Sequence, residues 1–93
     1  MIIGIINIKI HIPWARSLKE KRMVVKSICA KVRGKYNVSI AEVEEQDIHQ
    51  IIGLGIACVT NETTQADSIM DNVINYIESN IDGVIIKVER EII

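Results

Sequence analysis

The first twelve residues of the chain carry isoleucine at almost every second position. From Ile2 to Ile12 the even positions are isoleucine except for Gly4, whereas the odd positions become polar from Asn7 onward. Side chains that alternate with a period of two lie on opposite faces of a β-strand, and isoleucine is a strong strand former. The pattern predicts a strand with one face in a hydrophobic core, ended by Pro13.

A helix is predicted directly after this strand. Ser17 and Glu20 have the spacing of a capping box, so the helix is expected to begin near Leu18. At about 100° per residue, one side of the segment is apolar, and Gly34 is expected to end the helix. The residues of the predicted apolar stripe are Leu18, Val25, Ile28, Cys29 and Val32.

The rest of the chain repeats strand and helix patterns. Residues 37–43 and 51–60 predict two strands joined by a polar connection, and the second is apolar on both faces, as a central strand is. A second helix is expected from Thr63 or Thr64, acting as the cap, to Asn80 in a left-handed conformation. Residues 84–91 alternate again and predict a final half-buried strand.

The predicted order is therefore β-α-β-β-α-β, which is the ferredoxin-like order of an α+β domain. Right-handed crossovers place both helices on one face of a four-stranded antiparallel sheet, with the first and third strands in the middle. With 93 residues, of which 48% are hydrophobic, the chain is long enough for a single domain, expected to span residues 1–93. Apolar runs are too short for a membrane helix, and two distant cysteines form no disulfide framework.

Several segments also resemble the YlxP-like family of small bacterial proteins of unknown function. They are residues 17–22 (SLKEKR), 26–27 (KS), 37–43 (NVSIAEV), 46–47 (QD), 54–55 (LG), 77–80 (IESN) and 88–92 (VEREI). The resemblance covers the chain from end to end and implies a ferredoxin-like fold. Members of the family are often encoded beside factors of translation initiation and ribosome maturation, so the resemblance also implies a ribosome-linked role. It supplies no catalytic residues.

Charge is divided unevenly along the chain. Residues 1–35 hold nine basic residues and one acidic residue, whereas residues 36–93 hold two basic and eleven acidic residues. On the first predicted helix, four cations fall within a sector of about 60° away from the apolar stripe, and Arg16 precedes the cap, where free amides favour an anion. Lys21 and Lys31 are expected to flank the stripe on its other side. The candidate anion-binding or RNA-binding residues are Arg16, Lys19, Arg22, Lys26 and Arg33. The alternative is that these cations form an ordinary solvated helix face or pair with the acidic residues of the second predicted helix.

Contact with RNA through the sheet is not expected. The chain has one Trp, two Tyr and no Phe, and the two predicted central strands carry no aromatic residue on which bases could stack. Their second face offers Ile3, Ile5 and, from the last strand, Ile85, an apolar patch that a second copy could cover. With Trp14 as an anchor, these residues form the candidate interface of a homodimer; the alternative for Trp14 is that it folds over the edge of the core.

Enzymatic interpretations have less support. Cys29 and Cys58 fall at apolar positions and are expected to be core residues, while the spacing of Asp47 and His49 fits a solvated loop better than a metal site. The loop before Arg16 lacks the glycine-rich cradle of an acylphosphatase, a fold relative. We therefore expect no catalytic residue, no metal and no cofactor.

The sequence leads to three hypotheses. The first is a cytoplasmic, non-enzymatic homodimer that binds ribosomal RNA or a ribosomal subunit through its basic helix, without a membrane. The second is a homo-oligomeric protein-interaction module with no nucleic-acid partner, in which the basic helix meets an acidic protein surface. The third is an acylphosphatase-like hydrolase that depends on Arg16.

Overall fold

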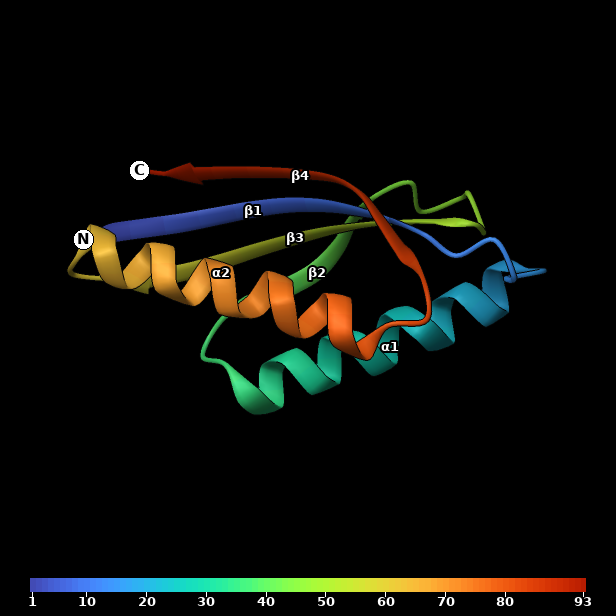
Figure 1. Ribbon diagram of the computed structural model, residues 1–93. Helices are drawn as coiled ribbons and strands as arrows, with labels where there is room; N and C mark the ends of the chain where they lie inside the picture. Colours follow the sequence, from blue (N-terminus) through green and yellow to red (C-terminus); the bar gives the residue numbers. More distant parts are fainter.

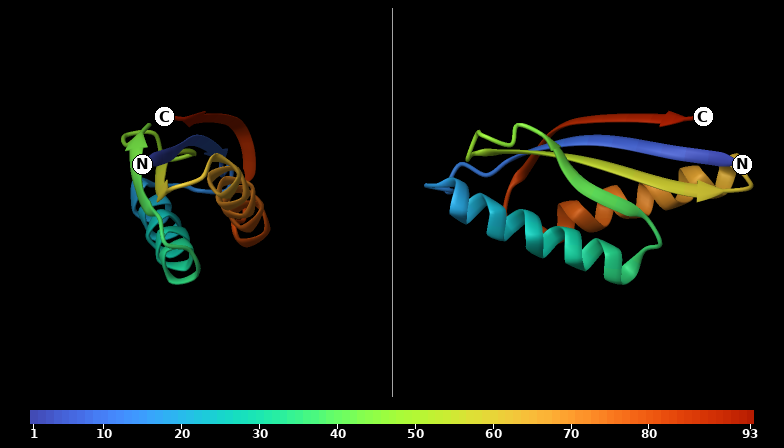
Figure 2. Two further views of the ribbon diagram at one scale, coloured as in Figure 1. Left: turned by 90° about the vertical axis from the view of Figure 1, so that its left-hand side faces the viewer. Right: turned by 180° about the vertical axis from the view of Figure 1, so that it is seen from behind.

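The computed structural model describes all 93 residues as six elements. They are β1 (Ile2–His11), α1 (Leu18–Lys35), β2 (Ser39–Glu44), β3 (Ile51–Thr60), α2 (Thr63–Asn80) and β4 (Val84–Ile92). The strands form one sheet in the order β2-β3-β1-β4, with every neighbouring pair antiparallel. Both helices cover the same face of this sheet, as Figures 1 and 2 show. The predicted ferredoxin-like fold, with the first and third strands central, is confirmed.

The core lies between the sheet and the two helices. As the alternation predicts, the even residues of β1 face the helices and the odd residues lie on the opposite side, which we call the open face. Each buried isoleucine contributes about 1.5–3 kcal/mol relative to an exposed one. The central strands supply Ile6, Ile8, Ile10, Ile52, Leu54 and Ile56 to the core, and α2 supplies Met70, Val73 and Ile77.

An irregularity in β4 overturns one prediction. The pairing of β4 with β1 shifts by one residue, so that Ile86 is the extra residue of a bulge and Ile85 lies opposite Ile10. Because paired residues share a face of the sheet, Ile85 packs against the core. The prediction that Ile85 shares the open face with Ile3 and Ile5 was wrong, since the bulge inverts the alternation at this point.

The helix ends agree with the sequence only at the start of α1. Ser17 is extended, and its hydroxyl accepts a hydrogen bond of 3.2 Å from the amide of Glu20, which is one half of the predicted capping box. The side chain of Glu20 makes no bond back to the amide of Ser17. Gly34 does not end the helix: α1 runs on to Lys35, and the extended Tyr36 leaves it without a left-handed residue. A glycine with no left-handed role is simply a helical residue, which the sequence pattern could not distinguish from a terminator.

The ends of α2 also differ from the prediction. Glu62 occupies the N-cap position and makes no side-chain cap bond, so neither Thr63 nor Thr64 acts as the cap. Asn80 is the last helical residue, and Ile81 continues in an extended conformation. The Asn80 amide donates to the carbonyl of Tyr76, one turn back, which explains why an asparagine is accommodated there. Neither helix is both long and apolar enough to span a membrane.

Candidate functional site

The cations of α1 lie together on the surface. The structure exposes all five residues that the sequence singled out. Four lie in one sector of α1, which includes Arg33 and its contact with β2, and Arg16 directly precedes the helix. We call this set the basic row; it consists of Arg16, Lys19, Arg22, Lys26 and Arg33. Apart from Arg33, none of them makes a hydrogen bond or an ion pair with another side chain or with the backbone. Their charges are therefore available to a partner.

Arg33 connects the basic row to the edge of the sheet. Its Nη2 donates a hydrogen bond of 2.7 Å to the carbonyl oxygen of Ile40 in β2. A guanidinium has five N–H donors, so this contact fixes the position of the side chain and leaves most donors free. The row thus runs beside an edge strand, with one end anchored to the backbone.

The acidic residues of α2 do not neutralise the basic row. Arg90 of β4 forms ion pairs with Asp67 and Asp71, and no ion pair joins α1 to α2. The interpretation that the acidic helix is the partner of the basic helix is therefore wrong for direct contacts. Two carboxylates of α2 pair with Arg90 of β4, whereas the basic row is exposed to solvent.

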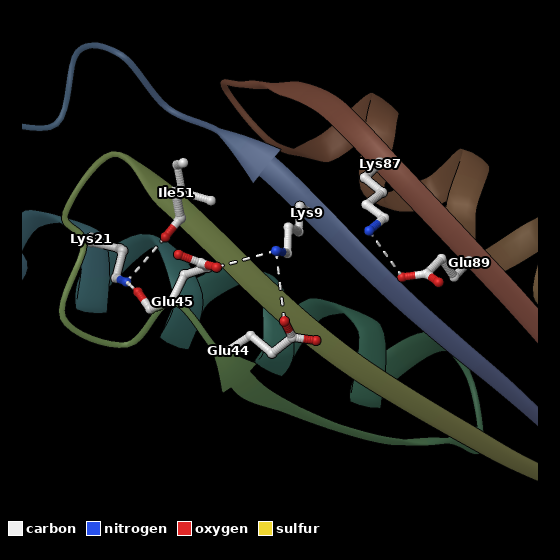
Figure 3. Close-up of polar contacts among 7 residues, drawn as sticks. All are labelled: Lys9, Lys21, Glu44, Glu45, Ile51, Lys87 and Glu89. Carbon is white, nitrogen blue, oxygen red and sulfur yellow. Dashed lines mark hydrogen bonds and ion pairs between the residues drawn. The ribbon is translucent and has the colours of Figure 1, made fainter.

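A buried lysine holds the start of α1 against the sheet. Lys21 is the only charged residue that is fully buried. Its Nζ donates hydrogen bonds of 2.5 Å to the carbonyl of Glu45 and 3.1 Å to the carbonyl of Ile51, and lies 2.9 Å from Oε2 of Glu42. Figure 3 shows this ammonium group reaching the carbonyl of Glu45, in the β2–β3 connection, and that of Ile51, the first residue of β3. The Oε2 atom of Glu42 is buried and is balanced by the charge of Lys21 without an aligned hydrogen bond.

The prediction that Lys21 flanks the apolar stripe was wrong. At 100° per residue, Lys21 falls between Ile28 and Val32, in the middle of the buried side of the helix. The signal was present in the sequence, but a lysine is almost never fully buried unless it is paired, and the pairing depends on residues far along the chain. The tertiary structure supplies Glu42 and two backbone carbonyls as partners.

A second lysine holds the same connection from the open face. Glu45 has a φ of 60°, and its carboxylate accepts a hydrogen bond of 3.1 Å from Lys9 of β1. Glu44 lies 3.6 Å from the same ammonium group. The hydrogen bond and the charge of Glu45 raise the pKa of Lys9. The β2–β3 connection is therefore held by Lys21 on one side and Lys9 on the other, as Figure 3 shows.

The residues of the predicted dimer interface do not form one surface. Ile3 and Ile5 are half-buried on the open face, beside the exposed Val59 and Ile93. Trp14 follows the opposite end of β1, where its Nε1 donates a hydrogen bond of 2.6 Å to the carbonyl of Asp82. It borders an open groove of about 480 Å³ between α1 and the end of α2. With Ile85 in the core, the four residues lie in three separate places.

The cysteine and histidine residues form no reactive cluster. Cys29 and Cys58 are buried free thiols, and no three His, Cys, Asp or Glu side chains come together as a metal site would require. Burial raises the pKa of the Cys29 thiol, an effect that the nearby charge of Arg33 partly offsets. A raised pKa disfavours the thiolate, which is the nucleophilic form.

Comparisons with known proteins agree with the fold and leave the function open. The model of a family described as "Protein of unknown function (DUF503)" matches residues 3–90. An uncharacterized protein, YlxP from Bacillus subtilis (strain 168), is 43% identical over 65 residues, which cover 70% of this chain and 71% of the relative. A solution NMR structure of a de novo designed protein with a ferredoxin fold matches with a TM-score of 0.59 at 19% identity, covering 99% of this chain and 85% of that one.

Proposed function

Because the chain belongs to the DUF503 family, whose function is unknown, we propose a function from its surface: a non-enzymatic protein that binds structured RNA on the ribosome. The basic row would make the contact, and the protein would act in the cytoplasm. One observation carries this proposal. Four exposed cations lie on one side of α1 and a fifth, Arg16, directly precedes the helix; four of the five have no partner within the protein.

The geometry of α1 suits a phosphate backbone. A helix 18 residues long spans about 27 Å, and its cations repeat along one side, so they can meet successive phosphates. Arg16 lies beside the helix start, where free amides and the helix dipole favour an anion. Ser17 caps this end, and Lys21 anchors it to the sheet, so the row is held on a rigid element. Such contacts give affinity that falls steeply with salt.

The open face supports a helix-borne contact and not base stacking. On the two central strands this face carries aliphatic residues and glycines together with Asn7, Lys9 and His11, and it has no Phe, Tyr or Trp; Lys9 is already engaged by Glu45. Recognition of single-stranded RNA by a sheet depends on aromatic side chains at such positions. The proposed ligand is therefore RNA with a folded backbone, read by shape and charge.

The experiment is co-sedimentation with purified small and large ribosomal subunits across a salt series. The test variant carries Arg22→Glu and Lys26→Glu in the basic row. The matched control carries Lys31→Glu and Lys35→Glu, which change the net charge equally on another side of the same helix. Far-UV circular dichroism shows whether each variant is folded.

We expect salt-sensitive binding that the test variant loses and the control largely keeps. Each lost phosphate contact reduces the slope of the logarithm of affinity against the logarithm of salt concentration by about 0.7–0.9. Equal loss in both variants would indicate attraction by net charge alone. Absence of binding even at low salt would contradict the proposal.

A second candidate function is a protein-interaction module without a nucleic-acid partner. The observation that favours it is the apolar end of the open face, where Val59 and Ile93 are 67% and 58% exposed beside Ile3 and Ile5. A competition experiment separates the two functions. If the basic row binds RNA, structured RNA should displace its bound partner. If the protein is an interaction module, only an acidic protein should displace that partner. The basic row would serve as an electrostatic docking surface in either one.

A further inference from the structure

The outer strand β4 is an unpaired edge of the sheet. It pairs only with β1, and Figure 1 shows it along one side of the sheet with no element beyond it. Three of its apolar side chains are exposed: Val84 at 61%, Ile86 at 53% and Val88 at 38%. An edge strand of nine residues presents a row of free backbone groups that can pair with another strand.

The hydrogen bonds at the end of β4 show which backbone groups are free. Ile3 and Ile93 exchange both of their N–H to carbonyl bonds at 2.9 Å. In an antiparallel pair, such bonded positions alternate with positions whose groups point away. The uninterrupted pairing from Ile92 back to Lys87 therefore directs the N–H and carbonyl groups of Val88, Arg90 and Ile92 outward from the sheet.

We propose that two copies of this chain pair through β4, antiparallel, about a two-fold axis at Val88. In this register Val88 lies opposite Val88 of the second copy, and each donates its outward N–H to the carbonyl of the other. The two four-stranded sheets become one continuous sheet of eight strands. The occupant of the edge is thus a second copy of the same chain.

The charges of β4 select this register. With the axis at Val88, Lys87 of each copy lies opposite Glu89 of the other, on the open face, which gives two ion pairs across the junction. At Lys87 and Glu89 the backbone groups of β4 bond to β1, so across the new junction these residues form non-hydrogen-bonded pairs. The side chains of such pairs approach each other most closely. Moving the axis by one residue would place Lys87 or Glu89 opposite its own copy, and moving it to Arg90 would oppose two arginines.

The same two side chains already adopt a suitable position. Lys87 Nζ lies 3.4 Å from Glu89 Oε1 within one strand, and both side chains are more than half exposed. Figure 3 shows them side by side on β4, away from the polar contacts of the β2–β3 connection. On pairing, each charge would exchange its neighbour on the strand for one across the junction. An exposed pair gives little stability, so this exchange costs little.

The proposed contact is independent of RNA binding. β4 and β2 are the opposite edges of the sheet, and the basic row adjoins β2. A dimer through β4 therefore leaves both basic rows free at the far ends of the eight-stranded sheet. Failure of one proposal would not imply failure of the other.

Sedimentation equilibrium over a range of protein concentrations tests this contact. We expect a mass that rises toward twice that of the monomer. Lys87→Glu or Glu89→Lys should each weaken dimerisation about tenfold or more, because two ion pairs become two like-charge contacts. The double variant Lys87→Glu with Glu89→Lys restores opposite charges across the junction and should recover the dimer. Lys31→Glu, an exposed change on α1, is the matched control and should have no effect.

Val88→Pro tests the backbone bonds directly. A proline at this position removes an N–H that points outward, so the pairing of β4 with β1 keeps its bonds while the second copy loses its central contact. We expect a folded monomer. If this variant fails to fold, the charge variants still decide the question. A monomer at every concentration, a dimer indifferent to both charge reversals, or no recovery in the double variant would each overturn the proposal.

Discussion

The two helices have the same length and cover the same face of the sheet, yet their charged side chains have different partners. Each has 18 residues. α1 buries the lysine Lys21 beneath it and leaves a row of cations unpaired on its surface. α2 buries only apolar residues, carries no basic residue, and has two of its carboxylates bound by Arg90.

The comparison distinguishes cations that stabilise the fold from cations that are free to bind a partner. The ammonium group of Lys21 is fully engaged inside the protein, whereas Lys19 and Arg22, close to it in sequence, have no partner. One turn of α1 therefore holds both kinds of cation. α2 has no comparable division, because its charges lie on the surface and β4 compensates part of them.

The largest effect should come from Lys21→Met. The substitution leaves Glu42 as an uncompensated carboxylate and removes the donor from two carbonyl groups, which should lower the free energy of unfolding by about 3–5 kcal/mol. Urea denaturation measures the change. Adding Glu42→Met should restore part of the loss, because the buried charge is then gone. Lys19→Met is the control and should change stability by less than about 0.5 kcal/mol. A loss in Lys21→Met no larger than that of the control would contradict the role assigned to this lysine.

The corresponding change in α2 is Ile77→Ala. This side chain is fully buried, and its truncation should cost about 2–5 kcal/mol through lost burial and the cavity left behind. Unlike Lys21→Met, it involves no charge, so no second substitution at a polar residue should restore it. Denaturation of the single variant and of its combination with Glu42→Met distinguishes the two helices. If Glu42→Met restored the stability lost in Ile77→Ala, the proposed contrast between a charged contact under α1 and apolar contacts under α2 would be wrong.

The helix starts provide a smaller contrast. Ser17→Ala should destabilise the protein by about 1 kcal/mol, because α1 loses its side-chain cap. Glu62→Ser should instead stabilise the protein by several tenths of a kcal/mol, because α2 now lacks a side-chain cap bond. Thermal unfolding of both variants measures the difference. Shifts of the same sign would contradict the capping difference between the helices.

The surface contacts of α2 should matter less. Arg90→Ala removes the ion pairs to Asp67 and Asp71, which are exposed, and should cost less than about 1 kcal/mol. The cost should shrink further as salt is added, since exposed charges are screened. Denaturation at low and high ionic strength measures this. A cost that is unchanged by salt would indicate that Arg90 stabilises the protein by packing.

The pH dependence of stability should reveal the environment of Cys29 on α1. Because burial raises the pKa of this thiol, the folded state holds the proton more tightly than the unfolded state. The contribution is present below the ordinary value of 9.0 and is lost as the pH rises through the raised pKa. Denaturation from pH 7 upward should show a shallower decline above pH 9 in Cys29→Ala than in the unmodified protein. Equal slopes would contradict the raised pKa.

Periodicity was sufficient for the elements but not for their irregularities. Alternation in β1 correctly predicted which isoleucines face the helices, and the Ser17 cap correctly located the start of α1. The same alternation misplaced Ile85, because a bulge depends on how two strands pair and not on one strand alone. The helix ends after Gly34 and Asn80 were missed for a similar reason. Residues suited to a left-handed cap also fit within a helix when the following chain leaves in an extended conformation.

For the candidate site, the sequence was sufficient to predict the basic row. It was not sufficient to predict the contacts of Arg33 and Lys21 that hold α1 against the sheet. A row of cations at helical spacing is visible in one segment, and the structure exposes those residues together. The hydrogen bond from Arg33 to β2 and the burial of Lys21 connect segments 7 and up to 30 residues apart. That β4 is an edge followed from the predicted central position of the first and third strands, and the structure confirms it. Which of its backbone groups are free became clear only from its pairing with β1.

The sequence by itself determined the ferredoxin-like order, the isoleucine core and the division of charge between a basic and an acidic part, because each depends on local periodicity and composition. Only the tertiary structure decided which charges are used internally. Lys21 and Lys19 are the same residue type two positions apart, and the carbonyls and carboxylate that bury one of them come from β2, β3 and their connection. A buried ammonium is stable only where all its donors find partners, and only the folded chain brings those partners together.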